Sequence, residues 1–99
     1  MSINLDKLTM VHDEKNHRFI IPLEKDEAWA DYIIIGERII LTHLEVPHPF
    51  ERKGIGGKLT RLILEYSKAN NLKVISLCSY ISRFISRHPE FKPLEEVMD

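Results

Sequence analysis

The hydrophobic pattern of the chain changes at Pro47-His48-Pro49, and this change constrains the fold more than any other feature. Before it, segments rich in β-formers are separated by turn-forming residues, which is typical of strands. Proline has no N–H to give to a sheet, so the last of these strands ends here. The expected strands are residues 8–12, 18–23, 28–35 and 38–46.

After the prolines, apolar residues return at helical spacing, from Ile55 through Leu59 and Ile63 to Tyr66. Residues 73–78 form a short apolar run that predicts a buried strand, and a second helix is expected from Ile81 to His88. A strand–helix–strand unit forms a right-handed crossover, so the fifth strand should lie parallel to the fourth. We therefore predict an α+β fold in one domain over residues 1–99: a mixed, mostly antiparallel five-stranded sheet with two helices.

The fourth strand is expected to alternate strictly between two faces of the sheet. One face would carry Ile40, Thr42, Leu44 and Val46, and the other Ile39, Leu41, His43 and Glu45.

A basic, glycine-rich loop, residues 51–58, leads into the first helix. Glycines let backbone N–H groups approach a ligand closely, and a helix start adds unpaired donors and partial positive charge. Arg52, Lys53 and Lys58 add full charges. The loop matches neither the Walker A pattern nor the dinucleotide fingerprint. We predict that it binds a pyrophosphate; the alternative is a glycine-rich turn that only starts a helix.

Charge and composition exclude several other classes of protein. The net charge is −1, yet residues 52–92 hold nine Lys/Arg against two Asp/Glu, which suits a small polyanion better than bulk nucleic acid. One cysteine excludes an internal disulfide and a cysteine-based zinc site, and no histidine pair converges with carboxylates, so no metal is expected. The chain shows no secretory signal or apolar run of spanning length, so we expect a cytoplasmic protein without membrane contact.

Two stretches resemble the GNAT superfamily of N-acetyltransferases. Residues 52–59, placed after four strands, resemble the acetyl-CoA motif Gln/Arg-x-x-Gly-x-Gly/Ala: Gly54 and Gly56 match its glycines, while Glu51 departs from its leading position. The run Cys78-Ser79-Tyr80, followed by Phe84 and residues 88–94, resembles the small GNAT-like domains of the YjdJ type. The resemblance covers residues 19–94.

This resemblance implies an acetyl-CoA site between the fourth and fifth strands, which splay apart. It places the pantetheine arm beside the fourth strand at Leu44 and Val46, and the thioester between that strand end and Cys78–Tyr80, with Ser79 in the slot. The pyrophosphate would rest on the loop, whose expected binding residues are Arg52, Lys53, Gly54, Ile55, Gly56, Gly57 and Lys58. Arg83 and Arg87 either reach a 3′-phosphate of CoA or form a solvated helix face.

Three residues are candidates for catalysis in such a slot. Cys78 would take the acetyl group or handle the leaving thiolate, unless it is a buried core thiol. Tyr80 would protonate the CoA thiolate, unless it only packs. His43, oriented by Glu45, would accept a proton from the incoming amine, unless it only lies on a solvated face.

The function implied is transfer of an acetyl group from acetyl-CoA to a primary amine, either of a small molecule or of a protein lysine. The alternative is a CoA- or acyl-CoA-binding module with little or no catalysis, and a nucleic-acid-binding domain has the least support. We expect a monomer. The small domains of this type lack a longer C-terminal arm, which implies an open, shallow acceptor site.

Overall fold

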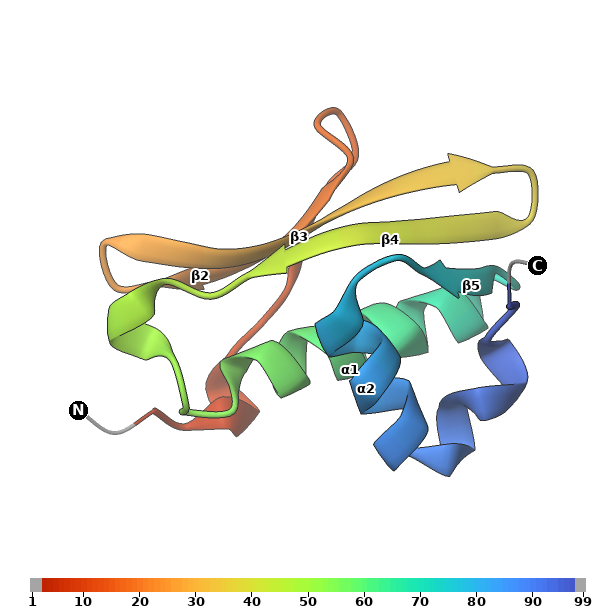
Figure 1. Cartoon of the computed structure of the whole chain (residues 1–99). Coiled ribbons are helices and arrows are strands. Elements are labelled where there is room, and N and C mark those ends of the chain that lie inside the picture. Colours follow the sequence, from red (N-terminus) through yellow and green to blue (C-terminus); the bar gives the residue numbers. More distant parts are fainter. Residues whose placement is uncertain (1–2, 98–99) are drawn as a thin grey trace.

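The computed structural model describes residues 3–97 and contains one five-stranded sheet with its strands in sequence order. The first four strands form an antiparallel meander, and β5 pairs parallel to β4 (Figure 1). This confirms the predicted mixed, mostly antiparallel sheet. The strands are β1 (Val11–Asp13), β2 (Arg18–Leu23), β3 (Asp26–Ile35), β4 (Arg38–Glu45) and β5 (Lys73–Ser76).

Both helices, α1 (Ile55–Ala69) and α2 (Ser79–Arg87), lie on the same side of the sheet (Figure 1). Helix α1 is followed by Asn70 and by Asn71, whose φ of 56° is the left-handed conformation that Asn tolerates. Three short 3₁₀ segments complete the described chain: Leu5–Lys7, His48–Phe50 and Pro89–Leu94. In residues 3–97 no helix covers the opposite face of the sheet, which we call the outer face.

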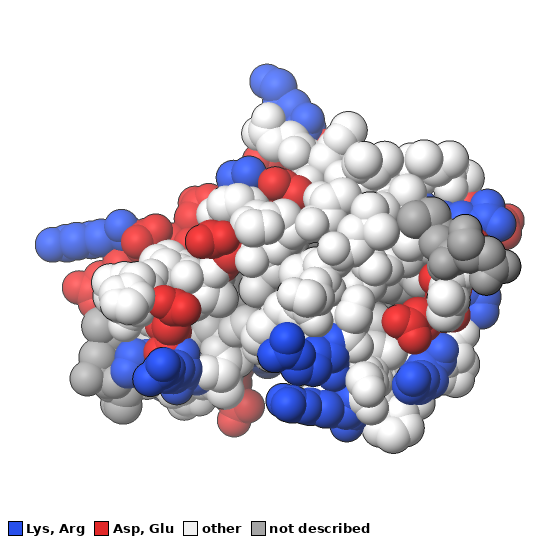
Figure 2. All heavy atoms as spheres, viewed as in Figure 1, with Lys and Arg blue, Asp and Glu red and all other residues white. Residues whose placement is uncertain are grey.

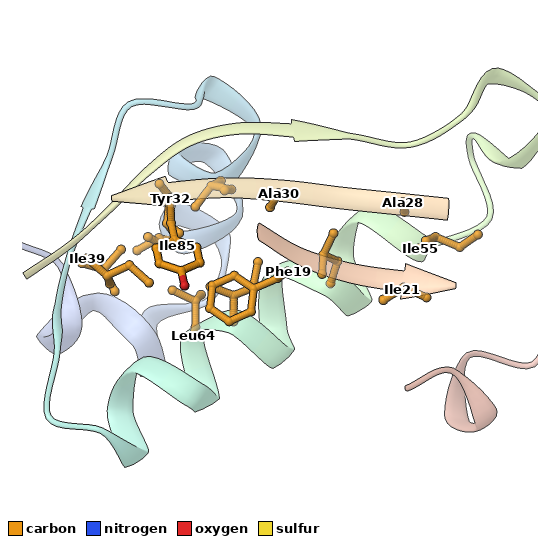
Figure 3. Close-up of a cluster of buried hydrophobic side chains, with 14 of the residues drawn as sticks. Phe19, Ile21, Ala28, Ala30, Tyr32, Ile39, Ile55, Leu64 and Ile85 are labelled. Atoms are coloured by element: carbon orange, nitrogen blue, oxygen red, sulfur yellow. The ribbon is translucent and has the colours of Figure 1, made fainter. Parts of the chain in front are cut away.

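The hydrophobic core lies between the sheet and the two helices (Figure 3). Strands β2, β3, β4 and β5 and helix α1 each place fully buried side chains in it, and α2 adds Ile81 and Ile85. Tyr32 belongs to this core and binds His12 through its hydroxyl at 2.7 Å, so one histidine that had no assigned role is a packing residue of the first hairpin. The remaining buried members are Phe19, Ile21, Ala28, Ala30, Ile39, Leu41, Phe50, Ile55, Leu59, Ile63, Leu64, Val74 and Phe91.

A β-bulge in β4 corrects the predicted alternation. Asp31 pairs with His43, but the next residue of β3, Tyr32, pairs with Leu41, so Thr42 is an extra residue without a partner of its own. The Thr42 hydroxyl donates to the Asp31 carbonyl at 3.2 Å. An extra residue reverses the faces beyond it. Ile39 and Leu41 are therefore buried in the same core that Leu44 and Val46 touch, whereas His43 and Glu45 are exposed.

Other predicted boundaries were also wrong: β3 begins at Asp26 rather than residue 28, and α2 begins at Ser79 rather than Ile81. The first strand begins at Val11 rather than Leu8, because Leu8 follows a 3₁₀ turn and packs against the core. The fifth strand ends at Ser76 rather than Cys78, since Ser82 N–H donates to the Cys78 carbonyl at 3.0 Å and helix α2 starts at Ser79. Cys78 is thus the residue that caps the helix start, not the end of the strand.

The free edge of β5 is partly covered by the C-terminal segment. Glu96 N–H donates to the Val74 carbonyl at 2.8 Å, and Glu95 forms a parallel bridge with Val74. The Glu96 carboxylate also pairs with Arg38 at the start of β4. No sequence pattern had predicted this cover.

Candidate active site

The sheet opens between β4 and β5 at the bulge. Their pairing ends where Leu41 meets Ser76, with one further bond from Leu77 N–H to the Leu41 carbonyl at 2.9 Å. Strand β4 continues to Glu45 while it pairs only with β3. The predicted splay of these two strands is therefore present, and the second half of β4 turns one edge toward the start of α2.

A cleft of about 470 Å³ lies at this opening. Its walls come from three places: the end of β4, the loop that precedes α1, and the first turn of α2. Seven of the predicted site residues line it: Leu44, Val46, Arg52, Gly54, Ile55, Gly56 and Tyr80. Glu45, Phe50 and Glu51 complete the lining. Phe50 was not predicted, although an aromatic residue directly before the glycine loop was a visible signal.

The glycine loop forms the floor of the cleft at the start of α1. Arg52 and Gly54 both have left-handed backbones, with φ of 62° and 85°. Gly54 offers no side-chain cap, and the first turn of α1 contains no acidic residue. The first N–H groups of a helix have no intrahelical acceptor, so the amides of residues 55–57 are available to an anion.

Tyr80 lies across Gly56. A Cβ at Gly56 would stand 2.9 Å from the Tyr80 hydroxyl oxygen, closer than such atoms approach, so only glycine lets the phenol rest here. Tyr80 keeps 44% of its surface exposed, but partial burial raises the pKa of the phenol above its ordinary value. The hydroxyl is therefore protonated at neutral pH and faces the cleft as a proton donor.

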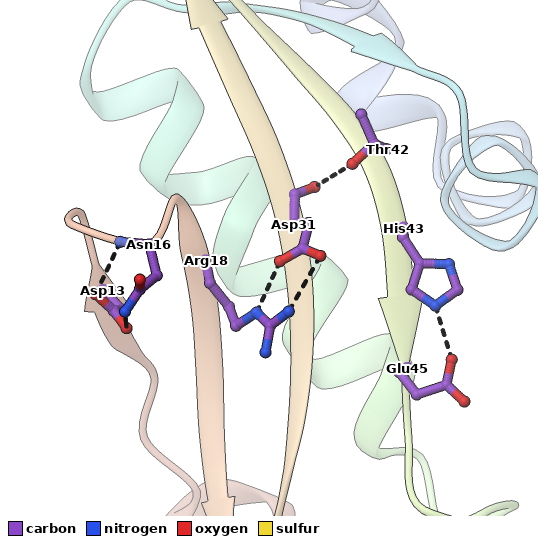
Figure 4. Close-up of polar contacts among 7 residues, drawn as sticks. All are labelled: Asp13, Asn16, Arg18, Asp31, Thr42, His43 and Glu45. Atoms are coloured by element: carbon purple, nitrogen blue, oxygen red, sulfur yellow. Dashed lines mark hydrogen bonds and ion pairs between the residues drawn. The ribbon is translucent and has the colours of Figure 1, made fainter.

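His43 and Glu45 form a hydrogen-bonded pair at the outer mouth of the opening. His43 Nε2 and a Glu45 carboxylate oxygen are 2.8 Å apart (Figure 4), and the imidazole packs on Trp29 with ring centroids 5.3 Å apart. Both side chains are about half exposed. The predicted pairing is confirmed, but Glu45 lines the cleft and His43 stands behind it.

A second histidine–carboxylate pair closes the other side of the cleft. A Glu51 carboxylate oxygen lies 2.7 Å from His48 Nδ1, within hydrogen-bond distance, and Glu51 lines the cleft beside Arg52. Its carboxylate is thus held at the position where the acetyl-CoA motif places Gln or Arg.

Several predicted site residues do not line the cleft. Cys78 is half-buried and packs against the core, while its carbonyl accepts from the Ser76 hydroxyl at 3.0 Å. Ser79 is exposed in the first turn of α2, and Arg83 and Arg87 are exposed farther along that helix. The others outside the lining are His43, Lys53, Gly57 and Lys58.

Residues 3–97 contain no cluster of three or more His, Cys, Asp or Glu side chains arranged to hold a metal ion. Within the same residues, neither helix combines the length and the apolar character needed to cross a bilayer.

Comparison with known proteins agrees with this geometry. A family model described as GCN5-related N-acetyl-transferase matches residues 18–94. Protein NATD1 of Gallus gallus is 32% identical over 89 residues, covering 87% of this chain and 81% of the relative. Protein NATD1 of Homo sapiens is 30% identical over 89 residues, with 87% and 79% covered.

Among solved structures, the NMR solution structure of a GCN5-like protein from Staphylococcus aureus superposes with a TM-score of 0.71. The match covers 93% of this chain and 91% of the other, at 22% sequence identity. The likeness at this identity concerns the fold alone.

Proposed function

Since this chain belongs to the GCN5-related N-acetyltransferase family, we propose that it binds acetyl-CoA in the cleft between β4 and α2 and transfers the acetyl group to a primary amine. The observation that carries this proposal is the lining of the cleft. A helix start with uncapped amides, the splayed end of a strand and a protonated tyrosine meet in one space. These are the groups that bind a pyrophosphate, receive an extended arm and donate a proton.

Acetyl-CoA fits this lining as a substrate. The amides of residues 55–57 and the Arg52 side chain would hold the pyrophosphate, with Lys53 before α1 and Lys58 near the start of that helix adding charge. The apolar edge of Leu44 and Val46 would pack beside the pantetheine arm. The negative charge of the Glu51 carboxylate repels a phosphate group. The hydrogen bond to His48 directs part of that charge toward the imidazole and away from the glycine loop.

We propose direct attack by the amine rather than an acetyl-Cys78 intermediate, because Tyr80 and Glu45 line the cleft and Cys78 does not. The amine nitrogen forms a bond to the thioester carbonyl carbon, and the C–S bond breaks with its electron pair left on sulfur. Glu45, held by His43, takes a proton from the amine nitrogen, and Tyr80 Oη gives a proton to the thiolate. Solvent then returns the proton from Glu45 to Tyr80.

The test is a calorimetric titration with acetyl-CoA, followed by an assay of acetyl transfer to primary amines. We expect Tyr80→Phe to retain acetyl-CoA affinity and to lose turnover by about 100-fold, the usual contribution of a positioned acid. Because burial raises the pKa of the Tyr80 phenol above its ordinary value, the wild-type acid stays protonated across the neutral range, and turnover should fall only when the pH approaches that raised pKa.

Cys78→Ala is the matched control, and we expect it to retain most of the turnover. An acetyl adduct on Cys78, or loss of turnover in Cys78→Ala with unchanged affinity, would move the reaction to the covalent route. Acetyl-CoA binding without any transfer would instead identify a binding module.

A further inference from the structure

The outer face of the sheet carries an apolar area at the end farthest from the glycine loop. Ile33 and Ile35 on β3 are 47% and 59% exposed, and Leu77, directly after β5, is 56% exposed. Ile33 pairs with Ile40, which pairs with Ile75, so one row of isoleucines crosses three strands. Ile75 is buried yet lies outside the main core cluster, which places it beneath this surface. We call Ile33, Ile35, Ile40, Ile75 and Leu77 the isoleucine face.

The opposite end of the outer face is acidic. Glu27, Asp31 and Glu45 lie there with a single arginine, Arg18, which binds Asp31 at 2.7 Å (Figure 4). Three carboxylates against one guanidinium leave a net charge of −2 when His43 is neutral. Figure 2 agrees: acidic side chains gather over the left-hand ends of β3 and β4, and the surface over their right-hand halves is largely uncharged. We call these three carboxylates the carboxylate end.

Both areas meet at the opening between β4 and β5. Leu77 donates the last hydrogen bond between the strands, to the Leu41 carbonyl, and Glu45 lines the cleft from the other side. An amine that reaches the thioester from the outer face would therefore pass between the carboxylate end and the isoleucine face. A cationic group is complementary to the carboxylate end, and apolar side chains are complementary to the isoleucine face.

We propose that the acceptor is a polypeptide, whose lysine enters the opening beside the carboxylate end while apolar side chains near that lysine cover the isoleucine face. The inference rests on the proposed acetyl transfer and specifies its substrate class. The distance between the two areas favours a polypeptide. Trp29 pairs with Glu45, and Ile35 lies six residues further along β3, which is about 20 Å in an extended strand. A small amine at the opening would leave the isoleucine face bare.

A second copy of the chain matches the outer face less well, because Arg38 and Lys73, which pair across β4 and β5, are already engaged. Arg38 pairs with Glu96, and Lys73 Nζ donates to the Pro93 carbonyl at 2.8 Å. Two outer faces stacked on each other would thus bring no available cation from these positions to the carboxylate end.

The probe is a fluorescent peptide of about 12 residues, long enough in extended form to span the outer face. It carries one lysine and has isoleucines at alternate positions on one side of that lysine. Two versions place the isoleucines before or after the lysine, and matched peptides have serine instead of isoleucine. Binding is measured by anisotropy with and without CoA, and acetylation by mass spectrometry, with spermidine as the small-amine comparison.

The variants separate the outer face from its surroundings. Ile33→Ser with Ile35→Ser removes exposed apolar surface from the isoleucine face. Ile34→Ser is the control, because Ile34 is also exposed but alternates to the other side of the same strand. Glu27→Lys reverses one charge at the carboxylate end, and Glu65→Lys makes the same change on an exposed position of α1.

We expect one isoleucine peptide to bind at least about tenfold more tightly than its serine match. The Ile33→Ser, Ile35→Ser variant should lose about that factor, and Glu27→Lys should weaken binding most at low salt. Ile34→Ser and Glu65→Lys should bind like the wild type. Calorimetry with acetyl-CoA on the same proteins tests the proposed function separately, since peptide binding does not require the thioester.

The proposal is overturned if isoleucine and serine peptides bind equally, or if Ile33→Ser with Ile35→Ser binds the isoleucine peptide like the wild type. It is also overturned if spermidine is acetylated as efficiently as the best peptide. A dimer by sedimentation that dissociates in the Ile33→Ser, Ile35→Ser variant would show that a second copy covers the isoleucine face.

Discussion

The two halves of β4 are equal in length but differ in sequence and in surroundings. Arg38–Leu41 pairs with β3 on one edge and β5 on the other, and its inward residues are fully buried. Thr42–Glu45 pairs with β3 alone, and its inward residue Leu44 is only partly buried and lines the cleft. Because the first half of β4 is paired on both edges, it contributes mainly to the stability of the fold. The second half has lost one strand partner after the bulge, so its free edge is available to a ligand.

The largest expected difference between these halves is in stability. Leu41→Ala should lower the free energy of unfolding by about 3 kcal/mol, because it leaves a cavity in a fully buried site. Leu44→Ala should cost about 1 kcal/mol, since that side chain is partly solvated, but it should weaken acetyl-CoA binding. Urea unfolding and calorimetry measure the two effects. Equal losses of stability would contradict the division of β4.

The cleft beside the second half of β4 can also be perturbed by substitutions in α1, on its opposite wall. Gly56→Ala places a methyl group 2.9 Å from the Tyr80 hydroxyl, so the phenol must move, and turnover should fall about tenfold. Gly57→Ala adds the same methyl group with its nearest neighbour, Phe84, at 3.7 Å, and should lower turnover less. Single-turnover rates at saturating acetyl-CoA compare the two. An equal loss in both variants would mean that helix geometry, not Tyr80, determines the rate.

The smallest effect is expected at the boundary between the halves. Thr42→Val keeps the branched shape but removes the hydroxyl that donates to the Asp31 carbonyl, at a cost of about 1 kcal/mol in unfolding free energy. If this bond holds the bulge, acetyl-CoA affinity falls in parallel with stability. A loss of stability with unchanged affinity would show that strand pairing alone maintains the opening.

Much of the fold followed from local patterns. The hairpins, α1 and the parallel fifth strand each rest on periodicity or on chain-crossover rules, and the glycine loop was identifiable because glycine and charge occur together before a helix. The bulge was not predictable in this way. Residues 38–46 contain no glycine or proline that would mark a bulge, and the extra residue at Thr42 is defined only by the pairing of Asp31 and Tyr32 across the sheet.

The same limit explains the differences between the expected site residues and the residues that line the cleft. Cys78 was placed in the slot because an apolar run continues from Val74, but the chain leaves the sheet at Ser76 to begin α2. Glu45 was considered only as a partner of His43, since its approach to the cleft depends on the bulge. Phe50 belongs to a 3₁₀ turn whose packing no periodic pattern encodes.

Residues 95 and 96, which cover the edge of β5, are synthesised after that strand, so the edge is uncovered for part of the synthesis of the chain. The β1–β4 meander joins neighbours in the chain, whereas Arg38 pairs with Lys73 across a long interval, so the meander forms first as the chain emerges from its N-terminus. Between the appearance of β5 and that of Glu96, the N–H and C=O groups of an edge strand remain open to any neighbouring nascent chain. Chains interrupted before Glu95 are therefore the ones most exposed to mispairing and to capture by quality control.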